Sequence, residues 1–158
     1  MTELDAPAQP EPKAKRKKPM SPTARTLAEC RERGWTAQVV ERWNQHARVR
    51  VDLFGVIDLV VLVPAAAVVN GYASGGAILA IQACAGDSHA ARRDKILAEP
   101  RARQWVEAGG RLELWSWSKR GDRGKAKRWT LRIETYAEML ASAPAPAALV
   151  DEGEAFAG

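Results

Sequence analysis

The chain has 158 residues, 46% of them hydrophobic, and a formal net charge of +5 at pH 7. This length allows one domain with a single hydrophobic core, and the two distant cysteines, Cys30 and Cys84, argue against a disulfide framework or a cysteine-rich zinc site. No apolar run is long enough to span a membrane and the first residues lack the apolar segment of a secretory signal, so we expect a soluble, cytoplasmic protein.

The two ends differ from the middle of the chain in composition and charge. Residues 1–20 mix Pro, Ala and Lys with a net charge of +2, and residues 137–158 are rich in Ala and Pro with a net charge of −4. Both are predicted to be disordered tails. Residues 21–136 then form the folded domain and carry the remaining +7. A basic domain suits a polyanion such as nucleic acid, although solubility alone would explain the same charge.

The folded segment begins with a predicted helix followed by two predicted strands. Ser21 is the expected N-cap of the helix, Pro22 occupies its first turn and Gly34 ends it. Residues 35–43 alternate in side-chain character, which predicts a strand. The apolar segment 51–62 is predicted to be the next strand.

The second half of the segment predicts further strands and helices. A loop at 64–76 leads to a strand at 77–84, a helix begins near Asp87 or Ser88, and Pro100 starts another helix that ends at Gly109–Gly110. Two alternating strands follow at 111–118 and 129–136, joined by a basic turn. The order predicts an α/β fold with a mixed central sheet of about five strands flanked by helices.

A carboxylate in the apolar segment 51–62 is the first candidate for a functional site. Asp58 is costly to bury without a partner, and the parity of the strands allows it to meet Gln82 on one face if these strands are neighbours. Carboxylate and amide oxygens suit a hard cation such as Mg²⁺ or Mn²⁺, and Glu41 is a second candidate carboxylate. The alternatives are structural: backbone N–H groups satisfy Asp58, and Glu41 pairs at the surface. Asp52 is interpreted as a solvated turn residue.

These residues lie in segments that resemble a known family. ERGWTAQVVERW, DLFGVIDLVVL and ILAIQAC followed by a basic helix resemble the core of the PD-(D/E)XK nuclease superfamily, with the small Holliday-junction-resolvase-like nucleases of phages and bacteria as the nearest likeness. The resemblance covers about the first two-thirds of the domain. It implies a restriction-endonuclease-like core, Mg²⁺-dependent hydrolysis of phosphodiester bonds in DNA, and a symmetric dimer.

The resemblance also implies roles for individual residues. Asp58 matches the metal-binding Asp of the family, Gln82 stands where the family has Glu or Asp, and Glu41 stands where some members have a further acid. Cys84 stands where the family has its catalytic Lys. Because a thiol supplies no cation, we expect a basic residue of the next helix to substitute. Lys95 is the first choice, since an ammonium is the usual group there.

Other basic residues are expected to contact the DNA backbone. Arg92 and Arg93 lie on the helix that follows Cys84, and the turn between the last two strands adds a further group: Lys119, Arg120, Lys125, Lys127 and Arg128. A solvated hairpin turn is the structural alternative for this group. The tryptophans at 115, 117 and 129 fit base stacking, but Trp at every second position of a strand is more often part of a core.

The sequence therefore predicts a Mg²⁺-dependent DNA endonuclease, with branched junction DNA as a candidate substrate. Asp58, Gln82 and Glu41 would bind the metal and Lys95 would assist. Two alternatives stay open. The first is a catalytically inactive nuclease-fold module that binds DNA or acts as a scaffold, because two motif positions are altered. The second is a small interaction protein whose basic tail recruits an acidic partner.

Overall fold

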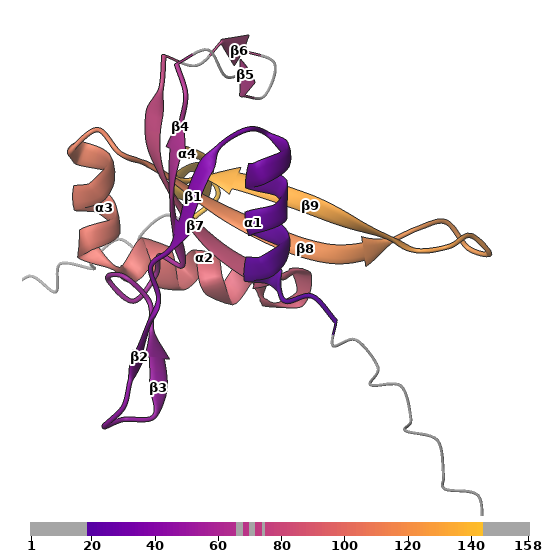
Figure 1. The fold of residues 1–158 in the computed structure, drawn as a ribbon, viewed down its shortest axis with the longest axis horizontal. Coiled ribbons are helices and arrows are strands. Elements are labelled where there is room, and N and C mark those ends of the chain that lie inside the picture. Colours follow the sequence, from indigo (N-terminus) through magenta and orange to yellow (C-terminus); the bar gives the residue numbers. More distant parts are fainter. Residues whose placement is uncertain (1–18, 66–67, 70–71, 74, 144–158) are drawn as a thin grey trace, which may run out of the picture.

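The computed structural model describes residues 19–65, 68–69, 72–73 and 75–143 (Figure 1). Both tails predicted from the sequence therefore lie largely outside the described residues. The elements, in chain order, are α1 (Pro22–Glu32), β1 (Thr36–Val39), β2 (Arg42–Asn44), β3 (Val49–Val51), β4 (Leu59–Val63), β5 (Val68–Val69), β6 (Tyr72–Ala73), β7 (Ala77–Ala85), a short 3-10 turn (Gly86–Ser88), α2 (His89–Ala98), α3 (Pro100–Glu107), β8 (Arg111–Arg120), β9 (Arg128–Thr135) and α4 (Tyr136–Ala141).

A five-stranded sheet in the order β1-β4-β7-β8-β9 forms the centre of the fold. The β7–β8 pair is parallel and the other pairs are antiparallel. The parallel pair is connected through α2 and α3, as parallel strands require a crossover. The predicted α/β class, with a mixed sheet of about five strands flanked by helices, is confirmed.

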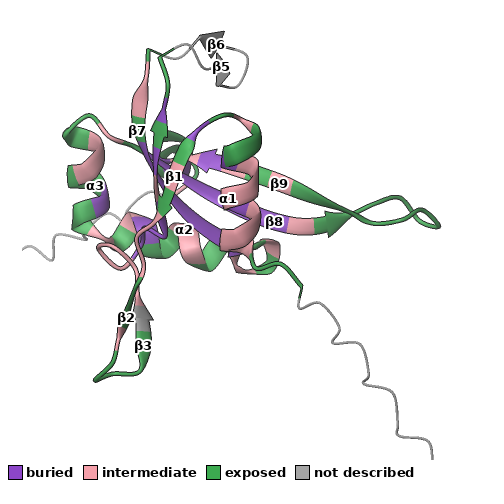
Figure 2. Cartoon of the chain, in the orientation of Figure 1, coloured by how far each residue is buried: buried purple, intermediate pink, exposed green. Residues whose placement is uncertain are grey.

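Helices cover both faces of the sheet, and the sheet separates the hydrophobic core into two parts (Figure 2). On one face, α1 packs through Cys30 over a layer that includes Leu59, Ile81 and Trp115. On the other face, α2, α3 and α4 contribute their own buried side chains over Ala80 and its neighbours; these are Ile96, Ala102 and Met139. No helix in the described part of the chain has both the length and the apolarity needed to cross a bilayer.

The predicted start of α1 is confirmed by its cap. The Oγ of Ser21 accepts a hydrogen bond from the backbone N–H of Ala24 (3.2 Å), and Pro22 occupies the first turn, where its missing N–H is not needed. Gly34 has a φ of 71°, a conformation that favours glycine after a helix. The Nε1–H of Trp117 donates to Thr26 Oγ1 (3.0 Å) and ties the helix to the sheet.

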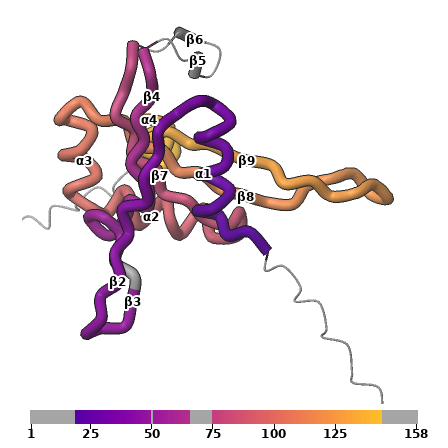
Figure 3. Tube along the Cα trace, in the orientation of Figure 1, coloured from indigo at the N-terminus to yellow at the C-terminus, as the bar shows by residue number. Residues whose placement is uncertain are grey.

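The predicted strand at 35–43 is wrong in its second half. β1 ends at Val39, and the chain then leaves the central sheet to form the separate β2–β3 hairpin. Alternation alone could not reveal this, because both halves are extended and only their partners differ. The hairpin projects from the body of the molecule (Figures 1 and 3).

The predicted strand at 51–62 is also interrupted. Residues 53–57 form a tight turn in which Phe54 and Gly55 have φ values of 55° and 77°. Left-handed backbone is incompatible with a strand, so β4 begins only at Leu59 and Asp58 immediately precedes it. Gly55 was the sequence signal for this turn.

Two further differences concern the loop at 64–76 and the end of the domain. Within the described residues the loop contains the short β5–β6 hairpin. At the other end, α4 extends beyond residue 136, where the sequence analysis ended the domain. Thr135 and Glu138 form a reciprocal capping box at its start, and Met139 is buried. The T-x-x-E pattern at 135–138 is a helix-start signal that the sequence carried.

Candidate metal centre

Asp58 lies where β1, β4 and β7 meet. Its backbone N–H donates to the carbonyl of Ile81 (3.0 Å), and its own carbonyl accepts from Val40 (2.8 Å). The side chain is only 6% exposed. Its Oδ2 accepts hydrogen bonds from Gln82 Nε2 (2.6 Å) and from the backbone N–H of Ala83 (2.8 Å). The contact between Asp58 and Gln82 that strand parity predicted is therefore present.

Two further carboxylates stand beside Asp58. One carboxylate oxygen from each of Glu41, Asp52 and Asp58 lies within 4.8 Å of the other two. Glu41 comes directly before β2 and Asp52 directly after β3, so the root of the β2–β3 hairpin brings both acids to the end of β4. Asp58 is buried, whereas Glu41 and Asp52 are half-buried. The cluster therefore has a buried floor and a partly open side.

Burial and mutual repulsion make it unfavourable for all three carboxylates of the cluster to be ionised. The pKa of Asp58 is raised to about 6, chiefly by burial, and the charges of Asp52 and Glu41 act in the same direction. The N–H of Ala83 and the guanidinium of Arg92 act to lower this pKa, but they do not outweigh burial. A divalent cation would relieve both the desolvation and the mutual repulsion.

Gln82 adds an oxygen that the protein leaves without a partner. The side chain is 1% exposed, and its Oε1 has no hydrogen-bond partner among the described residues. A buried acceptor in this state costs about 1–3 kcal/mol. Its Nε2 is bonded to Asp58, so the amide group lies at the edge of the carboxylate cluster. Amide oxygens are common ligands of hard cations.

The basic residues expected near the site are placed at different distances from it. Lys95 Nζ lies 3.9 Å from Asp52 Oδ2, and the Lys95 side chain is 49% exposed. The Nε of Arg93 lies 3.5 Å from Asp94, and the Arg93 side chain is only 24% exposed. Cys84 is buried, and burial raises the pKa of its thiol to about 11, so it stays neutral and cannot replace a lysine.

Asp52 is the site residue that the sequence analysis missed. It was interpreted as a solvated turn residue because it stands at the edge of an apolar segment. Its proximity to Glu41 arises from the β2–β3 pairing, in which Arg42 lies opposite Val51. A hairpin signal at 42–51 would have placed the two acids side by side, but the short strands and the four residues between them carry no Gly.

A cavity of about 520 Å³, lined by both charged and apolar residues, opens next to Asp52. The arginines at 42 and 101 contribute to its wall, and the other residues that line it are Val40, Val51, Leu53, Phe54 and Gly55. Arg101 is oriented by Glu99, which accepts from its Nε at 2.6 Å, and its guanidinium also reaches the carbonyl of Phe54 (3.3 Å). Asp52 and two cationic side chains thus border the same cavity.

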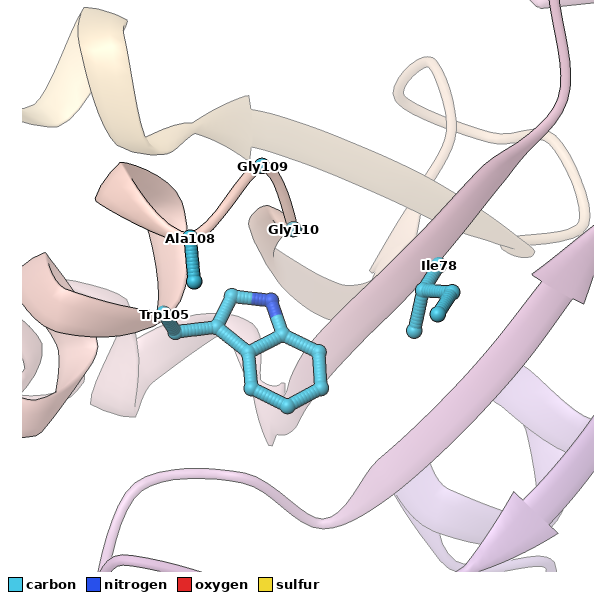
Figure 4. A pocket seen from close by; sticks show the side chains of 5 residues that line it. All are labelled: Ile78, Trp105, Ala108, Gly109 and Gly110. Carbon is cyan, nitrogen blue, oxygen red and sulfur yellow. The ribbon is translucent and has the colours of Figure 1, made fainter.

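A second cavity is apolar. It has a volume of about 270 Å³ and lies between the end of α3 and β7, where Trp105 faces Ile78 across it (Figure 4). The Trp105 indole N–H donates to the carbonyl of Arg111 (2.8 Å). The residues that line this cavity include no ionisable side chain, so it offers no group for hydrolysis.

The basic turn predicted to contact DNA is the far end of the long β8–β9 hairpin, which reaches away from the body (Figure 1). Its cationic side chains are all exposed; they are the predicted Lys119, Arg120, Lys125, Lys127 and Arg128, together with Arg123. Trp115 and Trp117 belong to the core, as the structural interpretation predicted. Trp129 is 41% exposed but lies under Arg25, whose Cζ is 3.8 Å from the ring centroid.

A buried polar network holds α2 to the sheet. His89 bonds Ser116 Oγ through Nδ1 (2.9 Å) and Glu134 Oε2 through Nε2 (2.5 Å). Ser116 is 2% exposed. The order Ser116–His89–Glu134 is that of a nucleophile, a base and an acid in a catalytic triad. Substrate cannot reach Ser116, however, because its side chain is buried. The network instead anchors the start of the helix that carries Arg92 and Lys95.

Comparison with known proteins finds no matching family model, no matching curated protein and no matching solved structure.

Proposed function

We propose that the protein is a Mg²⁺- or Mn²⁺-dependent DNA endonuclease that hydrolyses phosphodiester bonds. The observation that carries the proposal is the convergence of Glu41, Asp52 and Asp58 on one point, beside the unpartnered buried Oε1 of Gln82. Such an oxygen-rich set is the ligand chemistry that hard divalent cations prefer. Branched junction DNA is the first substrate to test, as the resemblance to resolvases implies.

Each residue has a stated role in this proposal. Asp58 is the buried anchor of the metal, Glu41 and Asp52 complete the carboxylate set, and Gln82 contributes its amide oxygen. When bound, the divalent ion polarises a phosphoryl oxygen and lowers the pKa of coordinated water. Lys95, held near Asp52, stabilises negative charge that develops on the phosphate.

The basic surface supports a polyanionic substrate. Arg42 and Arg101 border the cavity beside Asp52, where a phosphate next to the one under attack would lie. The cationic end of the β8–β9 hairpin, together with Arg92 and Arg93 on α2, offers more distant backbone contacts. A homodimer and a cytoplasmic location stay predictions; the free, buried Cys30 and Cys84 are compatible with a reducing compartment.

The test is cleavage of a DNA panel by the full chain. Four-way junction, duplex and single-stranded DNA are incubated with Mg²⁺ or Mn²⁺, and with EDTA as the blank. We expect metal-dependent cleavage that Asp58→Asn reduces at least about 100-fold, because loss even of a residue that only orients a metal ligand costs about 10- to 100-fold. Glu107→Gln, which removes an exposed charge on α3, is the charge-matched control and should cleave normally. Absence of cleavage of every substrate, or cleavage by Asp58→Asn at the control rate, would refute the proposal.

A second candidate function is a nuclease-fold module that binds DNA without cleaving it. The specific observation in its favour is the neutral, buried Cys84 at the position where the resembled family has its lysine. This candidate predicts salt-sensitive DNA binding that is unaffected by EDTA or by Asp58→Asn. Metal-dependent cleavage in the same panel would exclude it.

A further inference from the structure

The β2–β3 hairpin is a small arm that stands apart from the central sheet. Its two strands pair with each other and with no other strand in the described part of the chain. The turn at its tip is closed by Asn44, whose Oδ1 accepts from the backbone N–H groups of His46 (3.0 Å) and Ala47 (3.2 Å). An isolated two-stranded hairpin has little stability of its own. The arm therefore contributes little to the stability of the domain, and we ask what its exposed side chains could bind.

The arm has a strongly biased composition. Residues 42–51 contain three arginines and no acid, and Arg42 and Arg48 are exposed. Trp43 is 57% exposed, more than any other large hydrophobic side chain in the described residues. A large aromatic ring among cations is the combination that proteins use to stack unpaired bases and hold the strand that carries them.

The two exposed tryptophans differ in what covers them. Trp129 on the β8–β9 hairpin lies under Arg25 and near Lys119, so its ring already has partners. Among the side chains that the structure describes, which do not include that of Arg50, no aromatic ring or cation stacks on Trp43. With 57% of the residue exposed, the Trp43 ring is accessible to an unpaired base.

The arm also begins and ends at the candidate metal centre. Glu41 directly precedes it, Asp52 directly follows it, and Arg42 at its root borders the cavity beside Asp52. The acidic cluster alone repels a phosphate backbone, whereas the arginines of the arm attract it. A DNA strand bound to the arm would therefore pass next to Glu41 and Asp52, where the arm joins the domain.

We infer that the β2–β3 hairpin is a binding arm for DNA with unpaired bases, with Trp43 stacking on one base and Arg42 and Arg48 contacting the flanking phosphates. The substrate class of the metal centre is then single-stranded or locally opened DNA, including the open strands of a branch point. This inference rests on the proposed function for the identity of the polyanion as DNA.

The experiment measures binding in EDTA, so that cleavage does not enter it. Fluorescence anisotropy with the full chain compares a short oligothymidylate with a blunt duplex. Trp43→Ala is expected to weaken binding of the single strand about 10- to 100-fold and to change binding of the duplex less than about twofold. Trp43→Phe should recover most of the loss. Val49→Ala, which trims an exposed apolar side chain on the same hairpin, is the matched control and should bind like the wild type.

Three results would overturn the inference. The first is unchanged single-strand affinity of Trp43→Ala. The second is an equal loss on single strand and duplex, which would make the arm a general backbone contact. The third is Trp43-dependent binding to phosphatidylserine vesicles with DNA binding retained, which would make it a membrane contact.

The two proposals fail separately. If Trp43 supports single-strand binding but no substrate is ever cleaved, the arm stands and the nuclease function falls. If cleavage depends on Asp58 and metal while Trp43→Ala binds normally, the nuclease function stands and the arm falls.

Discussion

Replacing Asp58 by Asn should stabilise the metal-free protein while it abolishes the response to metal. The pKa of Asp58 in the folded chain is about 6, against an ordinary value of 3.8. Each pKa unit corresponds to about 1.36 kcal/mol, so the ionised carboxylate destabilises the fold by up to about 3 kcal/mol. Asn keeps an oxygen for the bonds from Gln82 and Ala83 and adds an N–H₂ group toward the neighbouring acids.

The sign of the pH dependence follows from the raised pKa. Below about pH 4 Asp58 is protonated in both the folded and the unfolded chain, so its ionisation has no effect on stability. Between about pH 4 and 6 the unfolded chain loses this proton first, and the contribution of Asp58 to stability falls as the pH rises. Above about pH 6 the full destabilisation is present, and there the Asn variant should exceed the wild type by about 1–3 kcal/mol.

Urea unfolding in EDTA, followed by circular dichroism from acid to neutral pH, measures this difference. With Mn²⁺ at about 100 times its dissociation constant, the wild type should gain about 2.7 kcal/mol and the variant almost nothing. Glu107→Gln should follow the wild type in both conditions. Equal stability of Asp58→Asn and wild type at neutral pH in EDTA, or an equal gain from Mn²⁺ in both, would refute the electrostatic account of the cluster.

Three other predictions concern the same site and the anchor of α2. Gln82→Glu adds another carboxylate to a buried cluster, so it should bind Mn²⁺ at least about tenfold more tightly, which calorimetry measures. For the same reason it should be less stable than the wild type in EDTA at neutral pH, which urea unfolding measures. The affinity of the wild type for Mn²⁺ should fall about tenfold for each pH unit below about pH 6, because a proton on Asp58 competes with the metal. Titration calorimetry from neutral pH downward measures this affinity, and a constant value would contradict the prediction. Glu134→Ala should lower the free energy of unfolding by about 2–4 kcal/mol, because it leaves His89 without its acidic partner in a buried network; an effect below about 0.5 kcal/mol in urea would show that the network does not anchor α2.

The sequence by itself determined the elements whose signals are local. Ser21 and Pro22 marked the start of α1, and side-chain alternation marked β8 and β9. Strand parity also predicted that Asp58 and Gln82 would meet on one face if their segments were neighbours. The structure supplies that condition, because β4 pairs with β7 and Asp58 directly precedes β4.

Only the tertiary structure decided which extended segments belong to the central sheet. A strand that stays in the sheet and one that leaves it as a hairpin have the same alternation, because alternation reports backbone extension and not the identity of the hydrogen-bond partner. The departure of the chain after Val39 creates the β2–β3 arm, and closure of that arm brings Asp52 to Glu41 and Asp58. The third carboxylate and the position of Trp43 thus depend on which strand each extended segment pairs with: β2 pairs with β3 and not with the central sheet, and side-chain alternation does not specify that choice.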